Sequence, residues 1–306
     1  MVTVNILLST FNGERYLSEQ IDSIINQTYS NWKLLIRDDG STDNTISIIN
    51  DYLGKDNRIE FINPLQVENV GVHKSFKYLA SYQKADYYFF CDQDDYWMPQ
   101  KIEKMIGNVG EFDSNIPQLW YSDFSSTDEN LKVIRQKLRN PNGNFINPPL
   151  KDALVCNVVT GCTAMINNAL KELWLTDKEI VGYHDTFCGL LAVTFGKVHF
   201  LDEVLILYRQ HSNNVAGIVS KKVKGVLTTF WNLNHTSTQR ATTILKEYDQ
   251  LLTDSQRRTL SDFVGLSTNN VFSRLKAVIN YQYLYSLGDW KYTLFMRILL
   301  IIRIGE

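Results

Sequence analysis

The chain has 306 residues, of which 44% are hydrophobic and 21% charged, with a formal net charge of −2 at pH 7. These values are typical of a soluble enzyme with one large domain, or one domain and an appendage. The total charge does not identify a partner, and we expect no nucleic-acid partner. The charge is uneven, because residues 1–217 carry 19 Lys and Arg against 27 Asp and Glu, whereas residues 218–306 carry 12 against 6. An acidic body therefore precedes a basic tail.

The cysteine spacing excludes the usual zinc and disulfide patterns. The sequence contains four cysteines, which are Cys91, Cys156, Cys162 and Cys188. None belongs to a C-x-x-C pair, and so few cysteines in a chain of this length favour reduced core residues of a cytosolic protein.

Neither end of the sequence predicts a membrane span. The first residues lack a basic region and a long apolar run, so no secretory signal is expected. The apolar segment 294–304 is interrupted by Arg297 and is shorter than the roughly 20 residues that a bilayer requires. Two interpretations of this segment are open: a buried packing helix, or a helix with basic ends that rests on an anionic membrane surface.

Hydrophobic periodicity predicts alternating strands and helices in the first hundred residues. Strands are predicted at residues 3–8, 32–36, 59–62 and 86–91, and helices at 13–26, 42–52 and 74–81. This alternation predicts a parallel sheet, in which ligands bind at the carboxyl ends of the strands. Thr10, Asp38 and Asp92 each begin a polar loop at such an end. Three loops are therefore expected to converge on one crevice.

The pattern is less regular after residue 96. It predicts a helix at 100–109, strands at 118–122 and 158–166, a strand pair at 197–207, and helices beyond residue 219. Residues 128–149 are rich in Asn, Pro and Gly and are expected to form a loop or lid. No internal repeat or low-complexity tract is present.

Three carboxylates lie within four positions, at Asp92, Asp94 and Asp95, directly after the apolar run 87–91. Crowded carboxylates repel one another and are costly to desolvate. A divalent cation with oxygen ligands, shared with a substrate phosphate, would offset both effects. The alternative is an exposed acidic turn.

Five strings occur in order at the intervals found in one family. They are Ser9-Thr10-Phe11-Asn12, Asn26-Gln27-Thr28-Tyr29, Arg37-Asp38-Asp39-Gly40-Ser41-Thr42-Asp43, Asn69-Val70-Gly71-Val72 and Asp92-Gln93-Asp94-Asp95. Over residues 1 to about 212 the chain thus resembles the family 2 glycosyltransferases, which have the GT-A fold, a Rossmann-like, mostly parallel α/β sheet flanked by helices. We expect a catalytic domain at 1–217 and a helical C-terminal region at 218–306. Cys91 to Trp97 and Tyr208 to Val215 look most like bacterial rhamnosyltransferases of cell-wall and surface polysaccharide synthesis.

The resemblance implies a set of donor-binding residues. Thr10, Phe11 and Asp39 would contact the pyrimidine, Asp39 by accepting a hydrogen bond from its N3–H. Glu14 would support the loop or the ribose, and Lys74 would face the phosphates. For Asp38, Asp39 and Ser41, the alternative is a capped turn ahead of a helix.

The resemblance also implies a metal site. Asp94 would bind Mn²⁺ or Mg²⁺, Asp92 would approach both metal and ribose, and His211 would complete the ligands or touch the diphosphate. Asp95 would bind sugar or acceptor. Arg209 would pair with phosphate or with one of the acids.

A glycosyl transfer with inversion needs a base that accepts the proton of the acceptor hydroxyl. The resemblance assigns this role to Asp185. The alternative is that Asp185 only caps the N-terminus of a helix. His184 stands where the family often has an acid, and we expect it in the acceptor site. Gly161 and Thr163 would line the same pocket, with a strand bulge as the alternative for the glycine. Trp97 would offer an apolar wall to a sugar, or belong to the core.

We therefore expect a metal-dependent, inverting glycosyltransferase that moves a sugar, L-rhamnose from dTDP-L-rhamnose, onto a lipid-linked polysaccharide at the inner membrane face. Transfer from a UDP-hexose or UDP-N-acetylhexosamine and a non-catalytic nucleotide-sugar-binding scaffold are the alternatives. A dehydrogenase is excluded because no G-x-G-x-x-G follows a strand, and a nucleotidyltransferase is disfavoured by the absence of a Gly-rich basic loop after the first strand. Residues 218–306 would bind a membrane surface, the acceptor or a second subunit.

Overall fold

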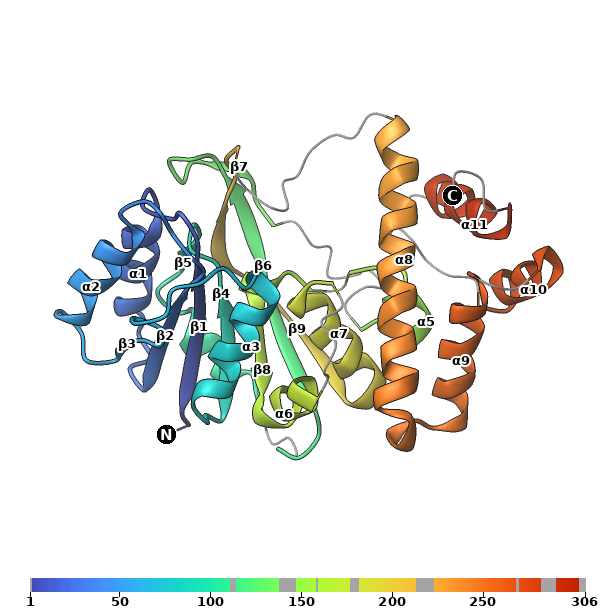
Figure 1. The fold of residues 1–306 in the computed structure, drawn as a ribbon, viewed down its shortest axis with the longest axis horizontal. Helices are drawn as coiled ribbons and strands as arrows, with labels where there is room; N and C mark the ends of the chain where they lie inside the picture. The colour runs from blue at the N-terminus through green and yellow to red at the C-terminus, as the bar shows by residue number, and fades with distance from the viewer. Residues whose placement is uncertain are drawn as a thin grey trace.

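A mixed sheet flanked by helices forms the body of the protein, and a group of long helices forms the other end, in the computed structural model (Figure 1). The strand order is β3-β2-β1-β4-β8-β6-β9-β5, and β7 pairs with β6. The structure describes residues 2–110, 114–137, 147–157, 159–176, 182–212, 223–267, 270–281 and 290–302.

The first half of the sheet is parallel, as the sequence predicts. Strand β1 (Val4–Thr10) lies between β2 (Trp32–Asp38) and β4 (Tyr87–Cys91), and β3 (Ile59–Phe61) extends the sheet beside β2. Three helices connect these strands: α1 (Leu17–Ile25), α2 (Thr45–Leu53) and α3 (Val72–Tyr82). The strands read as continuous apolar runs because helices cover both faces of the sheet.

The second half of the sheet is mixed. Strand β8 (Ala164–Asn167) runs antiparallel to both β4 and β6 (Gln118–Thr127), and β6 is buried along its whole length. Strand β9 (Lys197–Arg209) runs parallel to β6. The short strands β5 (Tyr96–Trp97) and β7 (Val133–Arg135) pair with β9 and β6.

Three sequence-based boundaries need correction. The predicted strand pair at 197–207 is one strand, which follows β6 through shifts in register near Asp123. Residues 161–163, in the middle of the predicted strand 158–166, form a 3-10 turn, η1 (Gly161–Thr163), and the strand begins only at Ala164. Helix α2 begins at Thr45, not at residue 42, because the Ser41 hydroxyl donates to Asp38 instead of capping the helix. Residues 138–146 of the predicted loop lie outside the described residues.

Four more helices follow in the chain. They are α4 (Lys101–Gly107), α5 (Leu150–Ala153), α6 (Asn168–Thr176) and α7 (His184–Phe195). Helix α5 packs against α7 and against α9 (Asp254–Gly265) rather than on the sheet. Helix α7 is apolar on most of its surface, and Phe187, Cys188 and Leu191 are buried. Its first residues therefore have a fixed position at the edge of the sheet.

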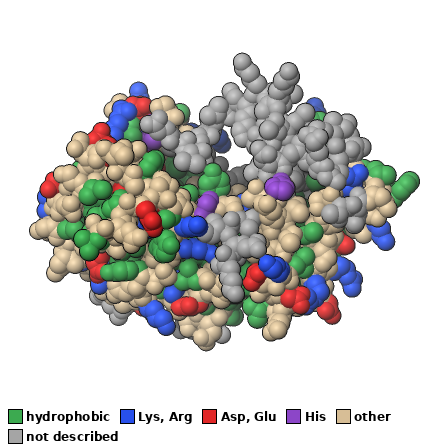
Figure 2. All heavy atoms as spheres, in the orientation of Figure 1, with side chains coloured by type: hydrophobic (Ala, Val, Ile, Leu, Met, Phe, Trp, Pro, Cys, Tyr) green, Lys and Arg blue, Asp and Glu red, His purple; other side chains and the backbone are tan. Residues whose placement is uncertain are grey.

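The C-terminal helices are α8 (Val223–Glu247), α9 (Asp254–Gly265), α10 (Val271–Tyr281) and α11 (Trp290–Ile302), with a short turn η2 (Asp249–Leu251). Ile244 of α8 and Phe263 of α9 belong to the same buried cluster as Leu191 of α7. Among the described residues, no helix is long and apolar enough to cross a membrane. Figure 2 shows charged side chains of both signs scattered over one face of the molecule.

Candidate active site

The acidic loop between β4 and β5 is joined to the loop after β1 by hydrogen bonds. The Gln93 side chain accepts from the Phe11 backbone N–H at 2.8 Å and donates to the Phe11 carbonyl at 3.0 Å. Gly13 permits this contact, because a Cβ there would lie 2.7 Å from Gln93 Cδ. Two of the three loops predicted to converge are thus in contact.

The loop after β2 joins the same group. Asp38 is fully buried, and its carboxylate accepts from the hydroxyls of Thr10 at 2.8 Å and Ser41 at 2.6 Å. It also accepts from the backbone N–H groups of Gly40 and Ser41. Asp38 and Ser41 therefore form a turn of their own, which is the alternative interpretation of these residues.

Asp39 is likewise held by protein groups. Its Oδ1 accepts from Arg37 Nη1 at 2.7 Å and from the Val70 N–H at 2.8 Å, and its Oδ2 accepts from the Gly71 N–H at 3.0 Å. A carboxylate oxygen can accept about two hydrogen bonds, so Oδ2 retains room for one more donor. This capacity agrees with the single hydrogen bond that the sequence-based hypothesis asks of Asp39.

The other predicted donor-site residues differ in exposure. Phe11 is 48% exposed at the mouth of the loops, whereas Thr10 is buried with its hydroxyl on Asp38. Glu14 accepts from the backbone and side chain of Asn44 at the start of α2, so it supports the loop. Lys74 is exposed in the first turn of α3.

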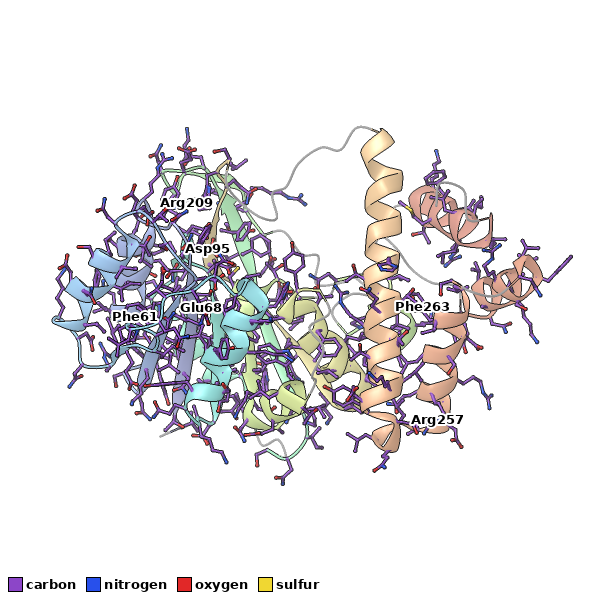
Figure 3. All side chains as sticks on the ribbon, in the orientation of Figure 1. Phe61, Glu68, Asp95, Arg209, Arg257 and Phe263 are labelled. Atoms are coloured by element: carbon purple, nitrogen blue, oxygen red, sulfur yellow. The ribbon has the colours of Figure 1, made fainter. Side chains whose placement is uncertain are left out.

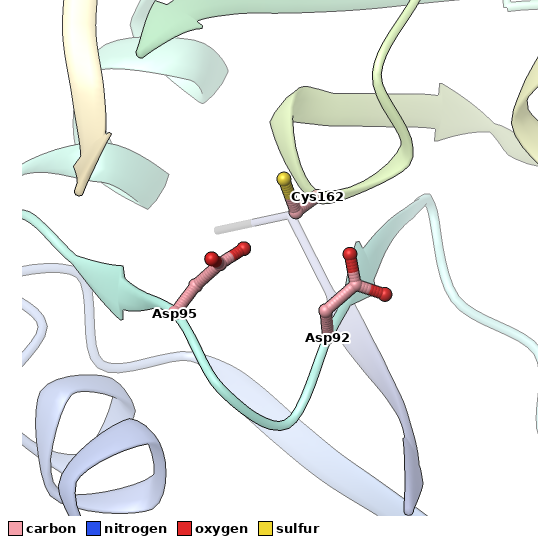
Figure 4. Close-up of side chains that lie close together, drawn as sticks. All are labelled: Asp92, Asp95 and Cys162. Carbon is pink, nitrogen blue, oxygen red and sulfur yellow. The ribbon is translucent and has the colours of Figure 1, made fainter. Parts of the chain in front are cut away.

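Asp92, Asp95 and Cys162 bring their polar atoms within 4.8 Å of one another, from the acidic loop and η1 (Figure 4). Burial and the charges of Asp94 and Asp185 raise the pKa of Asp92 to about 7. Burial also raises the pKa of Asp95, of which Oδ1 accepts from the Arg209 N–H. A hydrogen bond from the Cys162 thiol acts in the opposite direction on the pKa of Asp95, and no other group among the described residues hydrogen bonds to the buried Oδ2.

A buried lysine, which the sequence gave no reason to select, lies behind this group. Lys101 is fully buried, and its Nζ donates to the Cys162 carbonyl at 2.6 Å and lies 3.4 Å from the centre of the Trp97 ring. Burial lowers its pKa to about 8, while the charges of Asp92 and Asp95 act in the opposite direction. Nothing in the spacing separates Lys101 from Lys104, which forms an ion pair with Glu203 at the surface.

Asp94 and His211 lie on the other side of the loop and contact each other directly. The His211 Nε2 lies 2.8 Å from Asp94 Oδ2, and its ring packs against Tyr16 with centroids 5.0 Å apart. Of the predicted metal ligands, Asp94 thus contacts His211, and Asp92 lies close to Asp95 and within reach of the charge of Asp94.

Arg209 connects these groups (Figure 3). Its guanidinium donates to the carbonyls of Asp94 and Glu129 and to the carboxylate of Glu19, and it is 2% exposed. Arg209 was predicted to pair either with a phosphate or with an acidic residue. In the structure its guanidinium binds the Glu19 carboxylate and two backbone carbonyls.

Asp185 lies in the first turn of α7, across η1 from the acidic loop. Its Oδ2 accepts from the Gly161 N–H at 3.0 Å, and its Oδ1 accepts from the N–H and hydroxyl of Thr186. Burial raises the pKa of this carboxyl. Gly161 is in close contact, because a Cβ there would lie 3.4 Å from Asp185 Cβ and 3.1 Å from His184 Nε2.

His184 lies beside Asp185 among aromatic rings. Its ring centroid is 4.0 Å from that of Phe76 and 4.6 Å from that of Phe90, and burial lowers its pKa to about 3. Neither ring nitrogen has a hydrogen-bond partner among the described protein groups. His73 of α3 is near, with a centroid distance of 6.4 Å.

Two predicted acceptor-site residues are corrected by their burial. Trp97 is fully buried against Phe89 and Lys101, so its face is not available to a sugar and it belongs to the core. Thr163 is also fully buried, and its hydroxyl donates to the Thr160 carbonyl at 2.7 Å within η1. Gly161 contacts Asp185 rather than forming a strand bulge.

The donor atoms of the acidic loop fit a hard divalent cation. Carboxylate oxygens are the ligands that such ions prefer, and the raised pKa values of Asp92 and Asp95 reflect a cost of crowding buried carboxylates that a cation would relieve. Cys162 is a poor ligand here, since burial raises the pKa of its thiol and keeps it neutral.

The model of the family described as glycosyl transferase family 2 matches residues 5–174. The chain belongs to this family. An uncharacterised glycosyltransferase of Rickettsia typhi is 28% identical to it over 214 residues, which are 68% of this chain and 64% of that protein. The dTDP-rhamnosyl transferase RfbG of Shigella flexneri is 29% identical over 234 residues, covering 71% of this chain and 76% of RfbG. The matched part of the chain covers less than two thirds of the length of the first curated relatives.

Solved structures show the GT-A fold of this family 2 glycosyltransferase. The structure of S. aureus TarS with UDP-GlcNAc has a TM-score of 0.61 at 16% identity and covers 98% of this chain and 81% of that one. The mannosyltransferase PcManGT of Pyrobaculum calidifontis, in complex with GDP-Man and Mn²⁺, has a TM-score of 0.55 at 12% identity, with 98% and 85% covered. The predicted mostly parallel α/β fold with C-terminal helices is confirmed.

Proposed function

We propose that this protein is a metal-dependent, inverting glycosyltransferase. One observation carries the proposal: the turn η1 contacts the acidic loop on one side and Asp185 on the other. Cys162 lies within 4.8 Å of the Asp92 and Asp95 oxygens, while the adjacent Gly161 N–H donates to Asp185. A cation at the acidic loop and a base at Asp185 would then flank one position, as displacement at a sugar carbon requires.

Asp92 and Asp94 would hold Mn²⁺ or Mg²⁺, with His211 beside Asp94 and Asp95 behind Asp92. When bound, the cation would neutralise the diphosphate leaving group. Lys101, buried behind the loop, offsets part of the acidic charge and keeps the carboxylates close together before a cation binds. PcManGT supports the metal assignment, because its structure contains Mn²⁺.

Asp185 would act as the base. Its carboxylate takes the proton of the acceptor hydroxyl as the hydroxyl oxygen forms a bond to C1 of the sugar, and the bond from C1 to the diphosphate breaks with its electrons on the leaving group. Burial raises the pKa of Asp185, which makes the carboxylate a stronger base. Activity should fall as pH decreases through this raised pKa, because the protonated acid cannot accept a proton.

The proposed donor is dTDP-L-rhamnose, and the similarity to RfbG supports it. Phe11 would stack on the base, Asp39 would accept from its N3–H, Glu14 would hold the surrounding loop, and Lys74 would approach the phosphates. UDP-hexose and UDP-N-acetylhexosamine are the alternatives, and the UDP-GlcNAc bound to TarS supports the second.

The proposed acceptor is a lipid-linked polysaccharide at the cytoplasmic face of the membrane, and α10 and α11 support this location. Both helices leave apolar side chains exposed, which are Phe272, Leu275, Ile279, Leu294, Phe295 and Ile298. Residues 270–281 and 290–302 contain four basic and no acidic residues. This combination complements an anionic lipid surface better than a second copy of an acidic protein. Figure 2 shows hydrophobic side chains at the end of the molecule where α10 lies.

Nucleotide binding tests the donor site. Unfolding temperature would be measured with dTDP, UDP and GDP, each with and without Mn²⁺. A nucleotide at about 100 times its dissociation constant should add about 2.7 kcal/mol, a shift of several degrees. We expect the largest Mn²⁺-dependent shift with dTDP, its loss in Asp92→Asn, and its retention in Asp51→Asn on the surface of α2. A larger shift with UDP would favour a UDP-sugar as the donor in place of dTDP-L-rhamnose. No shift with any combination of nucleotide and Mn²⁺ would favour a non-catalytic scaffold protein.

Vesicle sedimentation tests the membrane surface. The protein should bind vesicles that contain phosphatidylglycerol more tightly than neutral ones, and Ile279→Glu should weaken this binding. Leu65→Glu is the matched control, because Leu65 is a 99% exposed leucine that belongs to neither α10 nor α11. If the protein formed a concentration-dependent dimer and did not bind vesicles, the exposed apolar residues of α10 and α11 would instead form a contact between two copies of the chain.

A further inference from the structure

The end of β9 and the residues that follow it contact both ends of Asp94. The Arg209 Nε donates to the Asp94 carbonyl at 2.8 Å, and the His211 Nε2 lies 2.8 Å from Asp94 Oδ2. The Arg209 backbone N–H also donates to Asp95 Oδ1 at 3.1 Å (Figure 3). Because two residues of one short segment hold the carbonyl and the carboxylate of Asp94, the direction of its side chain is fixed.

The Arg209 guanidinium is in turn held by two other parts of the chain. Its Nη2 donates to the carboxylate of Glu19 in the first turn of α1, and its Nη1 donates to the carbonyl of Glu129, between β6 and β7. A guanidinium is planar and its five N–H groups have fixed directions, so these two contacts determine where Nε points. Glu19 and Glu129 therefore set the position of the Asp94 carbonyl through Arg209.

The ring of Tyr16 packs on both halves of this arrangement. The centre of the ring lies 4.5 Å from the Arg209 guanidinium carbon and 5.0 Å from the centroid of His211. The Arg209 side chain is 2% exposed, whereas that of Glu19 is 48% exposed. A buried charged group is stable only when its donors are paired, so Glu19 stabilises the arginine while remaining accessible itself. Glu19 is therefore the point at which the arrangement can be weakened without opening the core.

We propose that Arg209, held by Glu19, is a positioning residue for Asp94: it presents the Asp94 carboxylate together with His211 to a divalent cation. This inference rests on the proposed cation at the acidic loop. Neither Arg209 nor Glu19 would touch the cation. Groups that only orient a metal ligand still change metal affinity by about 10- to 100-fold when they are removed.

Two variants weaken this arrangement at different points. Arg209→Lys keeps the charge but loses the planar set of donors, and Glu19→Gln removes the carboxylate. Glu60→Gln is the matched control, because Glu60 forms an ion pair with Lys33 in the same sheet. Binding of Mn²⁺ in the presence of dTDP, measured from the EPR signal of free Mn²⁺, should weaken about 10- to 100-fold in Arg209→Lys and less in Glu19→Gln. Glu60→Gln should match wild type.

A comparison of binding constants and rates distinguishes positioning from phosphate binding. In Glu19→Gln, the Mn²⁺ concentration that gives half of the maximal transfer rate should rise with the dissociation constant, while kcat at saturating Mn²⁺ is restored. The affinity for dTDP without Mn²⁺ should stay unchanged in both variants. A loss of that affinity in Arg209→Lys with unchanged Mn²⁺ binding would overturn the inference, because Arg209 would then bind the diphosphate itself.

Hydrogen exchange of the acidic loop is a readout that depends on neither metal nor transfer. Peptides that cover residues 91–97 should exchange faster in Arg209→Lys and Glu19→Gln than in wild type, and peptides that cover 38–45 should not change. If wild type bound no Mn²⁺, faster exchange would still support the positioning of Asp94 and would count against the proposed cation. Unchanged exchange at 91–97 together with unchanged Mn²⁺ affinity would overturn the inference. Because Glu19 is half exposed, Glu19→Gln gives this answer even if Arg209→Lys does not fold.

Discussion

The donor loops and the surroundings of Asp185 differ in how their polar groups are satisfied. In the loops after β1 and β2, the carboxylates of Asp38 and Asp39 accept several protein hydrogen bonds each. Around Asp185, both nitrogens of His184 are buried among aromatic rings without a described protein partner. The donor loops are held by hydrogen bonds to their carboxylates, whereas the surroundings of Asp185 combine hydrogen bonds to its carboxylate with the packing of His184 among aromatic rings. Substitutions in the donor loops and substitutions around Asp185 should therefore have different effects on nucleotide affinity, activity and stability.

Asp185→Asn should have the largest effect on activity. The amide keeps the size of the side chain but cannot accept the acceptor proton, so kcat should fall about 10²- to 10⁴-fold. The dissociation constant of the nucleotide should stay close to wild type, because the donor loops are held independently. Steady-state kinetics and calorimetric titration with dTDP and Mn²⁺ measure both quantities.

Asp202→Asn is the control for this variant, since Asp202 is partly exposed on β9 and pairs with Lys137. Near-normal transfer by Asp185→Asn would show that another group accepts the proton. A loss of nucleotide affinity equal to the loss of activity would show that the two sides of the site are not separate.

Lys101→Met should have the largest effect on stability. Removing Lys101 leaves the buried Cys162 carbonyl without its donor and takes away the positive charge that acts on Asp92 and Asp95, and an unsatisfied buried acceptor typically costs about 1–3 kcal/mol. Mn²⁺ should restore part of this loss, because the cation would replace the missing charge. Urea unfolding with and without Mn²⁺ measures the difference, with Lys104→Met as the surface control. Equal losses in both conditions would argue against a cation at the acidic loop.

The sequence predicted those parts of the molecule that depend on local pattern. The parallel strands, the acidic loop after β4 and the place of Asp185 at the start of α7 follow from apolar runs and from short motifs. Lys101 could not be predicted, because it becomes important through packing between segments far apart in the sequence. Trp97 shows the converse case, in which a residue next to a functional motif lies in the core.

Phe11→Ala should weaken nucleotide binding without destabilising the protein. Stacking of a base on an aromatic ring contributes about 1–3 kcal/mol, which corresponds to about 5- to 150-fold in affinity. Phe11 is 48% exposed and is held by its backbone on Gln93, so the loop should keep its shape without the ring. Glu14→Gln gives the contrast: it weakens the support of α2 and should lower stability more than affinity. Unchanged affinity in Phe11→Ala would place the base elsewhere.

His184→Phe should change stability only in acid. Burial holds the pKa of His184 at about 3, below its ordinary value of 6.5, so protonation favours the unfolded chain. The stability that neutral His184 contributes is present above pH 6.5 and is lost as pH falls toward 3, by up to about 1.4 kcal/mol per pH unit. The phenylalanine variant should lose less stability over this window, whereas His235→Asn, on the exposed side of α8, should follow wild type. Parallel unfolding curves for wild type and His184→Phe would mean that His184 has a hydrogen-bonding partner in solution, and the contrast between the two sides of the site would then disappear.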